Sequence, residues 1–217
     1  IIPGEGFDLE NHPFDVPVMP LPTDGFWAEI GHQDRDFWAF QGPFETFLYL
    51  DADTIVVKSL MPLAKRLSTQ QGDFVAIQDW VDDDTWHAVT QDPQHPDHTL
   101  YRQTIARDIG IGPLAEFDPE HDFFAHKPFN SGVFAGSRLA IKDSDLAALN
   151  KAERNFYRDA LGIGEWTWKS SELFFRDQGR LNYLVRKLSI PTLPLEPELI
   201  CVSGASSVHV PMEDVRG

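Results

Sequence analysis

The sequence has 217 residues, of which 42% are hydrophobic and 12% aromatic, so we expect one domain, residues 1–217, with a well-filled core. Its net charge of −16 argues against nucleic-acid binding, which needs clustered Lys and Arg. No stretch is apolar for long enough to span a membrane, and the N-terminus lacks the pattern of a signal peptide. A single cysteine, Cys201, fits a reducing compartment, and we expect a cytoplasmic protein.

The first half of the chain predicts an alternation of strands and helices. Residues 1–46 favour irregular structure with one short helix around 34–41. The apolar run 47–50 stops at Asp51, and continuous apolarity of this length is typical of a strand covered on both faces, so we expect it to be the central strand. Ser59 can cap a helix that reaches about Gln70, and a second buried strand, 74–77, ends at Gln78 and Asp79. This alternation predicts an α/β fold with a mixed, mostly parallel sheet flanked by helices.

The second half continues this pattern after an interruption. Residues 80–128 are rich in Asp, His and Pro, and we interpret them as an excursion from the sheet with one helical stretch near 99–109. The remaining predicted elements are a strand at 129–136, a long helix capped by Asp143 or Ser144 that reaches about Leu161, a helix at roughly 171–188, and short strands within 190–210.

Two carboxylates directly follow the first predicted strand. In open α/β sheets ligands bind at the carboxyl ends of strands, and Asp51 and Asp53 stand at such an end. Both can aim at one hard cation, for which oxygen ligands suit Mg²⁺ or Mn²⁺. From the spacing alone, an aspartate that caps a turn explains the pattern as well.

The residues around this pair resemble a known family. The string FLYLDADTIVVKSL is similar to the metal-binding signature of the glycogenin-like glycosyltransferases, family 8. FNSGVF (129–134), DQGRLNYL (177–184) and His209 follow in the family's order. The resemblance implies a Rossmann-like GT-A fold and retaining transfer of a hexosyl unit from a UDP-sugar to a carbohydrate, lipid or protein acceptor. It also implies a divalent cation, Mn²⁺ or Mg²⁺, bound by Asp51, Asp53 and His209.

The second and third signatures supply the expected sugar-binding residues. Asn130, Ser131 and Gly132 interrupt an apolar strand with small polar groups and a glycine, which permits close approach of ligand or backbone, although a bulge would also explain them. The resemblance assigns Asn130 to the donor sugar and places Asp177 and Gln178 against it. Asp177 lies in the apolar stripe of its predicted helix, so it needs a partner or a polar cleft, and a salt bridge with Arg180 or Arg176 is the alternative.

Two further positions match the family less directly. Arg35 precedes Asp51 by sixteen residues, where the family carries a basic residue for the diphosphate, but a surface ion pair with Asp34 or Asp36 is equally consistent. Asp79 ends the second strand, in a region where the family often has a sugar-binding acid. The sequence departs from the family in two places. The Lys-Pro-Trp that normally follows His209 is not found, and we expect the opening strand-helix-strand unit that holds uridine to be absent from residues 1–50.

Two other functions compete with the transferase hypothesis. Haloacid-dehalogenase-like phosphatases also place D-x-D after a buried strand, but the acidic cluster 82–84 lacks their context and order. A degenerate transferase domain that binds a carbohydrate or a protein partner is the non-enzymatic alternative, which the missing N-terminal unit favours.

Overall fold

The computed structural model describes most of the predicted elements, and all structural statements concern these residues. They are 19–22, 27, 32–51, 54–56, 58–79, 83–92, 94, 98–99, 102, 116–122, 124–161, 177–195 and 200–201. In chain order the elements are a 3-10 helix η1 (His32–Gln41), β1 (Thr46–Leu50), β2 (Thr54–Ile55), α2 (Met61–Ser68), β3 (Val75–Asp79), α3 (Asp83–Gln91), β4 (Phe129–Ser137), α6 (Asp143–Leu161), α8 (Asp177–Lys187), β5 (Thr192–Pro194) and β6 (Ile200–Cys201). None of the described helices combines the length and apolarity that crossing a membrane requires.

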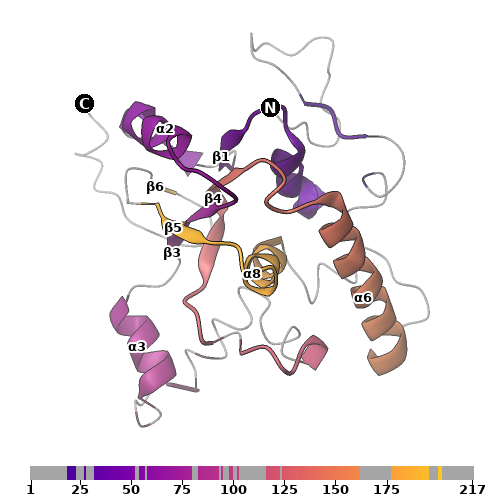
Figure 1. The fold of residues 1–217 in the computed structure, drawn as a ribbon. Helices are drawn as coiled ribbons and strands as arrows, with labels where there is room; N and C mark the ends of the chain where they lie inside the picture. Colours follow the sequence, from indigo (N-terminus) through magenta and orange to yellow (C-terminus); the bar gives the residue numbers. More distant parts are fainter. Residues whose placement is uncertain are drawn as a thin grey trace.

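The sheet is mixed, as predicted. Four strands pair in the order β1-β4-β3-β5 (Figure 1). β4 is antiparallel to both of its neighbours, whereas β3 and β5 are parallel, so three of these four strands run in one direction. A separate antiparallel pair, β2 and β6, joins the chain just after Asp51 to residues 200–201. The α/β class is therefore confirmed.

The prediction that residues 47–50 form the central strand is wrong. Among the described strands, β1 lies at one edge of the sheet, and β4 lies inside it. The run is apolar because helices cover both faces of β1: Phe47 and Tyr49 face one hydrophobic cluster, and Leu48 and Leu50 face the other. Continuous apolarity thus reports coverage of the two faces and not the position of the strand in the sheet.

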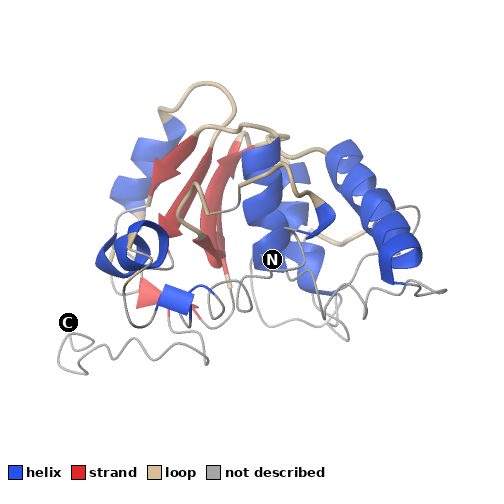
Figure 2. Cartoon of the chain, turned by 90° about the horizontal axis from the view of Figure 1, so that it is seen from below, coloured by secondary structure: helices blue, strands red, loops and turns tan. Residues whose placement is uncertain are grey.

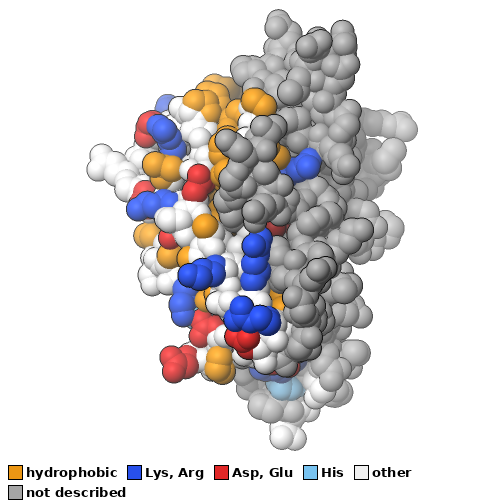
Figure 3. Space-filling model, turned by 90° about the vertical axis from the view of Figure 1, so that its right-hand side faces the viewer, with side chains coloured by type: hydrophobic (Ala, Val, Ile, Leu, Met, Phe, Trp, Pro, Cys, Tyr) orange, Lys and Arg blue, Asp and Glu red, His pale blue; other side chains and the backbone are white. Residues whose placement is uncertain are grey.

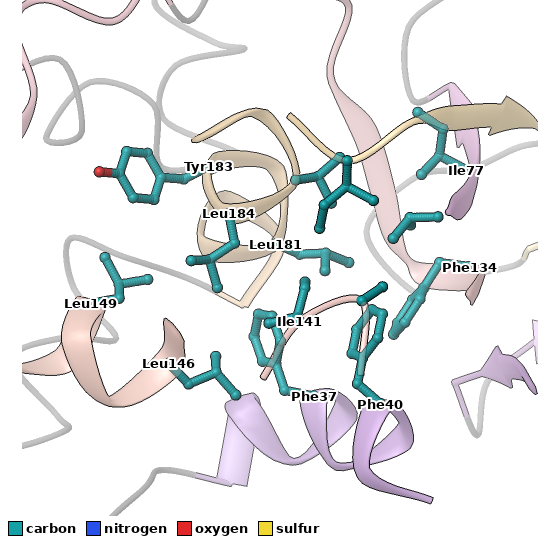
Figure 4. Close-up of a cluster of buried hydrophobic side chains, with 14 of the residues drawn as sticks. Phe37, Phe40, Ile77, Phe134, Ile141, Leu146, Leu149, Leu181, Tyr183 and Leu184 are labelled. Carbon is teal, nitrogen blue, oxygen red and sulfur yellow. The ribbon is translucent and has the colours of Figure 1, made fainter. Parts of the chain in front are cut away.

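The helices lie in two layers with the sheet between them (Figure 2). On one face, α2 packs its Leu63 and Leu67 against β3 and β4. On the other face, η1, α6 and α8 share the larger cluster, where Phe37 and Phe40 of η1 lie against Leu181 of α8 and Phe134 of β4 (Figure 4). η1 and α8 are thereby fixed against the same face of the sheet.

Most of the predicted elements form, with two differences. The helices expected after Ser59 and at 143–161 are confirmed as α2 and α6, and the predicted helix at 171–188 is present as α8 from Asp177 onward. Within 80–128 the structure has a helix that the sequence did not predict, α3, and most of the stretch 99–109 lies outside the described residues. The Asp, His and Pro content of 80–128 favours irregular structure and does not reveal the helix at 83–91, although Asp83 and Asp84 are favourable in its first turn.

Candidate functional site

The end of β1 and the start of β4 meet at one edge of the sheet. Because β1 and β4 are antiparallel, Leu50 pairs with Val133, and Asp51 therefore reaches the Asn130–Gly132 segment. The Asp51 amide donates a hydrogen bond to the Gly132 carbonyl at 2.8 Å. The first two predicted signatures are thus brought into direct contact, although Asp51 and Val133 are 82 residues apart in sequence.

Gly132 leaves room for the Asp51 carboxylate. A Cβ atom at position 132 would lie 2.8 Å from Asp51 Oδ2 and 3.1 Å from Asn130 Oδ1, so any side chain there would force the Asp51 carboxylate to shift. The other oxygen, Asp51 Oδ1, accepts a hydrogen bond from the Tyr49 hydroxyl at 2.8 Å, and the Gly132 amide donates to Asn130 Oδ1 at 2.7 Å. The predicted close approach at Gly132 is therefore made by the Asp51 side chain.

The third signature joins the same edge through the first turn of α8. The Ser131 hydroxyl donates to Asp177 Oδ2 at 2.9 Å, and the Ser131 amide donates to Gln178 Oε1 at 3.3 Å. One turn later, the buried Asn182 accepts from the Phe129 amide and donates to the Phe129 carbonyl, so α8 is fastened to β4 on two levels. Asp177 is hydrogen-bonded to Ser131. Of the two arginines offered as its alternative partners, Arg180 instead contacts Asp34, Asn150 and Glu153, and Arg176 lies outside the described residues.

Arg180 is the centre of a buried ion network. Its guanidinium, 1% exposed, donates to Asp34 of η1 and to Asn150 of α6, and lies 3.4 Å from Glu153 Oε2, also on α6. Burial raises the pKa of Glu153 to about 7, against the opposing effect of Arg180, and the negative charge of Asp34 adds to this rise. The network ties together three helices, two of which carry predicted site residues.

Sequence reasoning missed the two acids of η1. It offered Asp34 and Asp36 as surface partners of Arg35, but they are 8% and 5% exposed, and Asp34 binds Arg180. Arg35 itself is partly buried on η1. The available signal was the apolar sequence that follows, because Phe37 and Phe40 anchor this helix in the core and carry the neighbouring acids inward.

The edge of the sheet brings several carboxyl groups together in a buried setting. Burial raises the pKa of Asp177 to about 6; the Ser131 hydroxyl opposes this, and the charges of Asp34 and Asp51 reinforce it. Burial raises the pKa of Asp36 well above its usual range, and the charges of Asp177, Asp34 and Asp51 act in the same direction. The same causes raise the pKa of Tyr49, so its phenol stays protonated and can donate to Asp51.

The surface differs from this interior in its balance of charge. On the described part of the face in Figure 3, Lys and Arg side chains lie among Asp and Glu. Among the residues that the structure describes, the buried ionisable side chains are by contrast three acids and one base: Asp34, Asp36, Glu153 and Arg180. The interior near the site therefore contains more carboxyl groups than its basic residue can neutralise.

Asp79 lies at the same edge but is separated from Asp51 by β4. It ends β3 opposite Phe129, and its carboxylate accepts from Lys127 Nζ at 2.9 Å. Lys127 also bonds Asp83 at the start of α3. Among the described residues, Asp79 is hydrogen-bonded to Lys127 and not to another predicted site residue, so its role in sugar binding stays a prediction.

Two of the three predicted metal ligands, Asp53 and His209, lie outside the described residues. Within the part of the chain that the structure describes, no group of three His, Cys, Asp or Glu side chains is arranged to hold one ion. The metal prediction therefore stays a prediction, with Asp51 as its described member.

Comparison with known proteins adds no relative. No family model matches the sequence, no curated protein matches it, and no solved structure matches the fold.

Proposed function

We propose that the chain is the catalytic part of a retaining glycosyltransferase of the GT-A type, which moves a hexosyl unit from a UDP-sugar to an acceptor with the help of a divalent cation. The proposal rests on one observation. Three sequence segments that resemble separate signatures of one family, around Asp51, Asn130–Gly132 and Asp177–Gln178, are hydrogen-bonded to one another at the carboxyl end of β1. A ligand at this edge would meet all three.

The chemistry available at this edge suits departure of a diphosphate from a sugar. As that bond breaks, positive charge develops on the sugar ring, and preorganised acceptors stabilise it best where water is excluded. Asp177 and the Gln178 side chain are such acceptors, held by Ser131 before any substrate arrives. Since the pKa of Asp177 is raised only to about 6, its carboxyl group is mostly ionised at neutral pH and can play this role.

The residues at the edge fit a divalent cation. Carboxylate oxygens are the ligands that Mg²⁺ and Mn²⁺ prefer, and the negative charge of Asp51 raises the pKa of Asp177, a repulsion that a nearby cation would relieve. Asp51, with Asp53 and His209, would hold the ion. When bound, it would neutralise the charge that grows on the departing diphosphate.

The direct test is turnover of UDP-sugars by the purified chain with Mn²⁺, followed as release of UDP. We expect Asp53→Ala to abolish this activity because it removes one of the two carboxylates of the first signature. Asp73→Ala is the matched control, since Asp73 is an exposed acid in the turn before β3. Full activity in the Asp53 variant would refute the metal assignment.

The same preparation separates the competing functions. A phosphatase would release phosphate from a phosphomonoester and leave UDP-sugars intact. A binding domain without activity would show calorimetric binding of Mn²⁺ and UDP, or of a free sugar, with no release of UDP. Either result would contradict the proposed transfer.

A further inference from the structure

β4 contains a long bulge at the edge of the sheet where the three signatures meet. Between the pair Ile77–Phe134 and the pair Asp79–Phe129, β3 advances by two residues and β4 by five. Residues 130–133, which we call the β4 bulge, therefore have no partner on β3. Bulges occur often beside active sites, and the backbone groups that they release from the ladder need other hydrogen-bond partners.

Side-chain carboxamides take the place of β3 along this bulge. The Ser131 amide donates to Gln178 Oε1 at 3.3 Å, and the Gly132 amide donates to Asn130 Oδ1 at 2.7 Å. A backbone amide can only donate, so the carbonyl oxygen of each carboxamide faces it and the NH2 group is turned away. In the part of the chain that the structure describes, neither NH2 group has an acceptor, and both side chains are partly exposed. The bulge thus offers two hydrogen-bond donors to a ligand.

Asn182 makes the most extensive of these contacts, at the residue that precedes the bulge. Its side chain is 8% exposed. Oδ1 accepts from the Phe129 amide at 3.1 Å, and Nδ2 donates to the Phe129 carbonyl at 2.9 Å and to the Gln178 carbonyl at 2.8 Å. A residue of a neighbouring strand would bond Phe129 through the same two backbone groups. Asn182 therefore acts as a strand residue at the base of the β4 bulge and joins it to the first turn of α8.

We propose that Asn182 is a positioning residue, which holds the β4 bulge so that the two outward NH2 groups meet hydroxyl groups of the transferred sugar. This inference rests on the proposed function. The carboxylates of Asp51 and Asp177 lie at the same edge. A hydroxyl group can accept from an amide and donate to a carboxylate at the same time, so this combination suits a sugar. Asn182 itself acts only through the residues that it holds.

The first measurement is amide hydrogen exchange of the full chain by NMR, which reports on the bulge whether or not the chain is active. In the wild type we expect the Ser131 and Gly132 amides to exchange at least about 100-fold more slowly than in an unstructured peptide. Asn182→Ala should raise their exchange about tenfold or more relative to the Val75 amide in β3, because the bulge then opens locally. Asn182→Ser should give a smaller rise, since its hydroxyl can bond one of the two Phe129 groups.

Ser137→Ala is the matched control, because it also removes the side-chain partner of a strand amide. At the other end of β4, the Ser137 hydroxyl accepts from the Phe74 amide at 3.0 Å. This variant should leave the exchange ratio unchanged.

Steady-state kinetics then separates positioning from a general loss of stability. With Mn²⁺ and a UDP-sugar that the wild type turns over, Asn182→Ala should lower kcat by about 10- to 100-fold. Its Kd for UDP, measured by calorimetry, should stay unchanged because UDP lacks the sugar that the bulge meets. Asn182→Ser should recover part of kcat, and Ser137→Ala should keep the kcat of the wild type.

The outcomes separate this inference from the proposed function. Fast exchange at Ser131 and Gly132 in the wild type, or an unchanged ratio in Asn182→Ala, would overturn the inference and leave the transferase proposal standing. The same holds if the bulge opens in Asn182→Ala while kcat stays that of the wild type, or if neither Asn182 variant folds while Ser137→Ala does, because Asn182 is then structural. If the wild type turns over no UDP-sugar, the proposed function falls, and the role of Asn182 toward a sugar falls with it.

Discussion

Substitution of Gly132 by alanine tests whether the fold holds the Asp51 carboxylate in a defined place. The new Cβ would lie 2.8 Å from Asp51 Oδ2, closer than the 3.0 Å below which a neighbouring atom must shift, so the carboxylate has to move by a few tenths of an ångström. The hydrogen bond from Tyr49 to Asp51, now 2.8 Å, would be strained or lost. We expect an overpacking cost of about 1–3 kcal/mol in the free energy of unfolding. If Asp51 holds the cation of the proposed transfer, this displacement should also reduce kcat/KM, by up to roughly 100-fold.

Gly136→Ala is the matched control, because it adds the same methyl group to the same strand. Its Cβ would meet aromatic carbons of Phe40 at 3.0 Å and Phe47 at 3.2 Å, and no carboxylate. Chemical denaturation should therefore show a loss of stability in both variants, while Mn²⁺-dependent turnover should fall only in Gly132→Ala. Equal turnover in the two variants would refute the idea that Gly132 is required to place Asp51.

Two further substitutions probe the buried network of η1, α6 and α8. The pKa of Glu153 is raised from 4.5 to about 7, so between these pH values the folded protein retains a proton that the unfolded chain releases. The free energy of unfolding should therefore fall as the pH rises from about 4.5 to 7, by roughly 3 kcal/mol in total. Glu153→Gln should flatten that part of the pH profile of stability, measured by denaturation, while Glu45→Gln, at an exposed acid, should leave the profile unchanged. A wild-type slope in Glu153→Gln would contradict the assignment of the slope to Glu153. Arg180→Met should cost about 3–5 kcal/mol because it leaves Asp34 and Glu153 buried without their cation, and Asp34→Asn in the same chain should restore part of that loss.

The sequence predicted the layout of the sheet edge better than the position of the strands. Runs of apolar residues locate β1, β3 and β4 because buried strands need such runs wherever they lie in a sheet. Strand order depends on pairings between distant segments, which local pattern does not encode, and this is why β1 was expected in the centre. Asp51 could still be placed correctly, because it follows the strand whatever the strand's neighbours are.

The buried acids could not be predicted in the same way. Asp34 and Asp36 flank Arg35, so a surface ion pair with either acid is as consistent with the sequence as diphosphate binding by Arg35. Their burial depends on the cluster that Phe37 forms with α8, and the partner of Asp34 lies 146 residues later. A contact between residues so far apart in sequence can be recognised only once the helices are packed. The sequence alone is equally consistent with Arg180 as the partner of Asp177.

α8 is the element on which the anchoring contacts converge. Asn182 fastens it to β4, and Arg180 fastens it to η1 and α6. Both residues lie within about one and a half turns of Asp177, so the first turn of α8 is held from two directions while its own side chains remain directed to Ser131. A carboxylate that must meet a developing charge gains most when the elements around it are rigid, because no reorganisation is then needed during the reaction. On this reasoning the buried acids Asp34 and Glu153 are tolerated because they accompany the arginine that fixes α8, and the stability that they cost is linked to the precision with which Asp177 is placed.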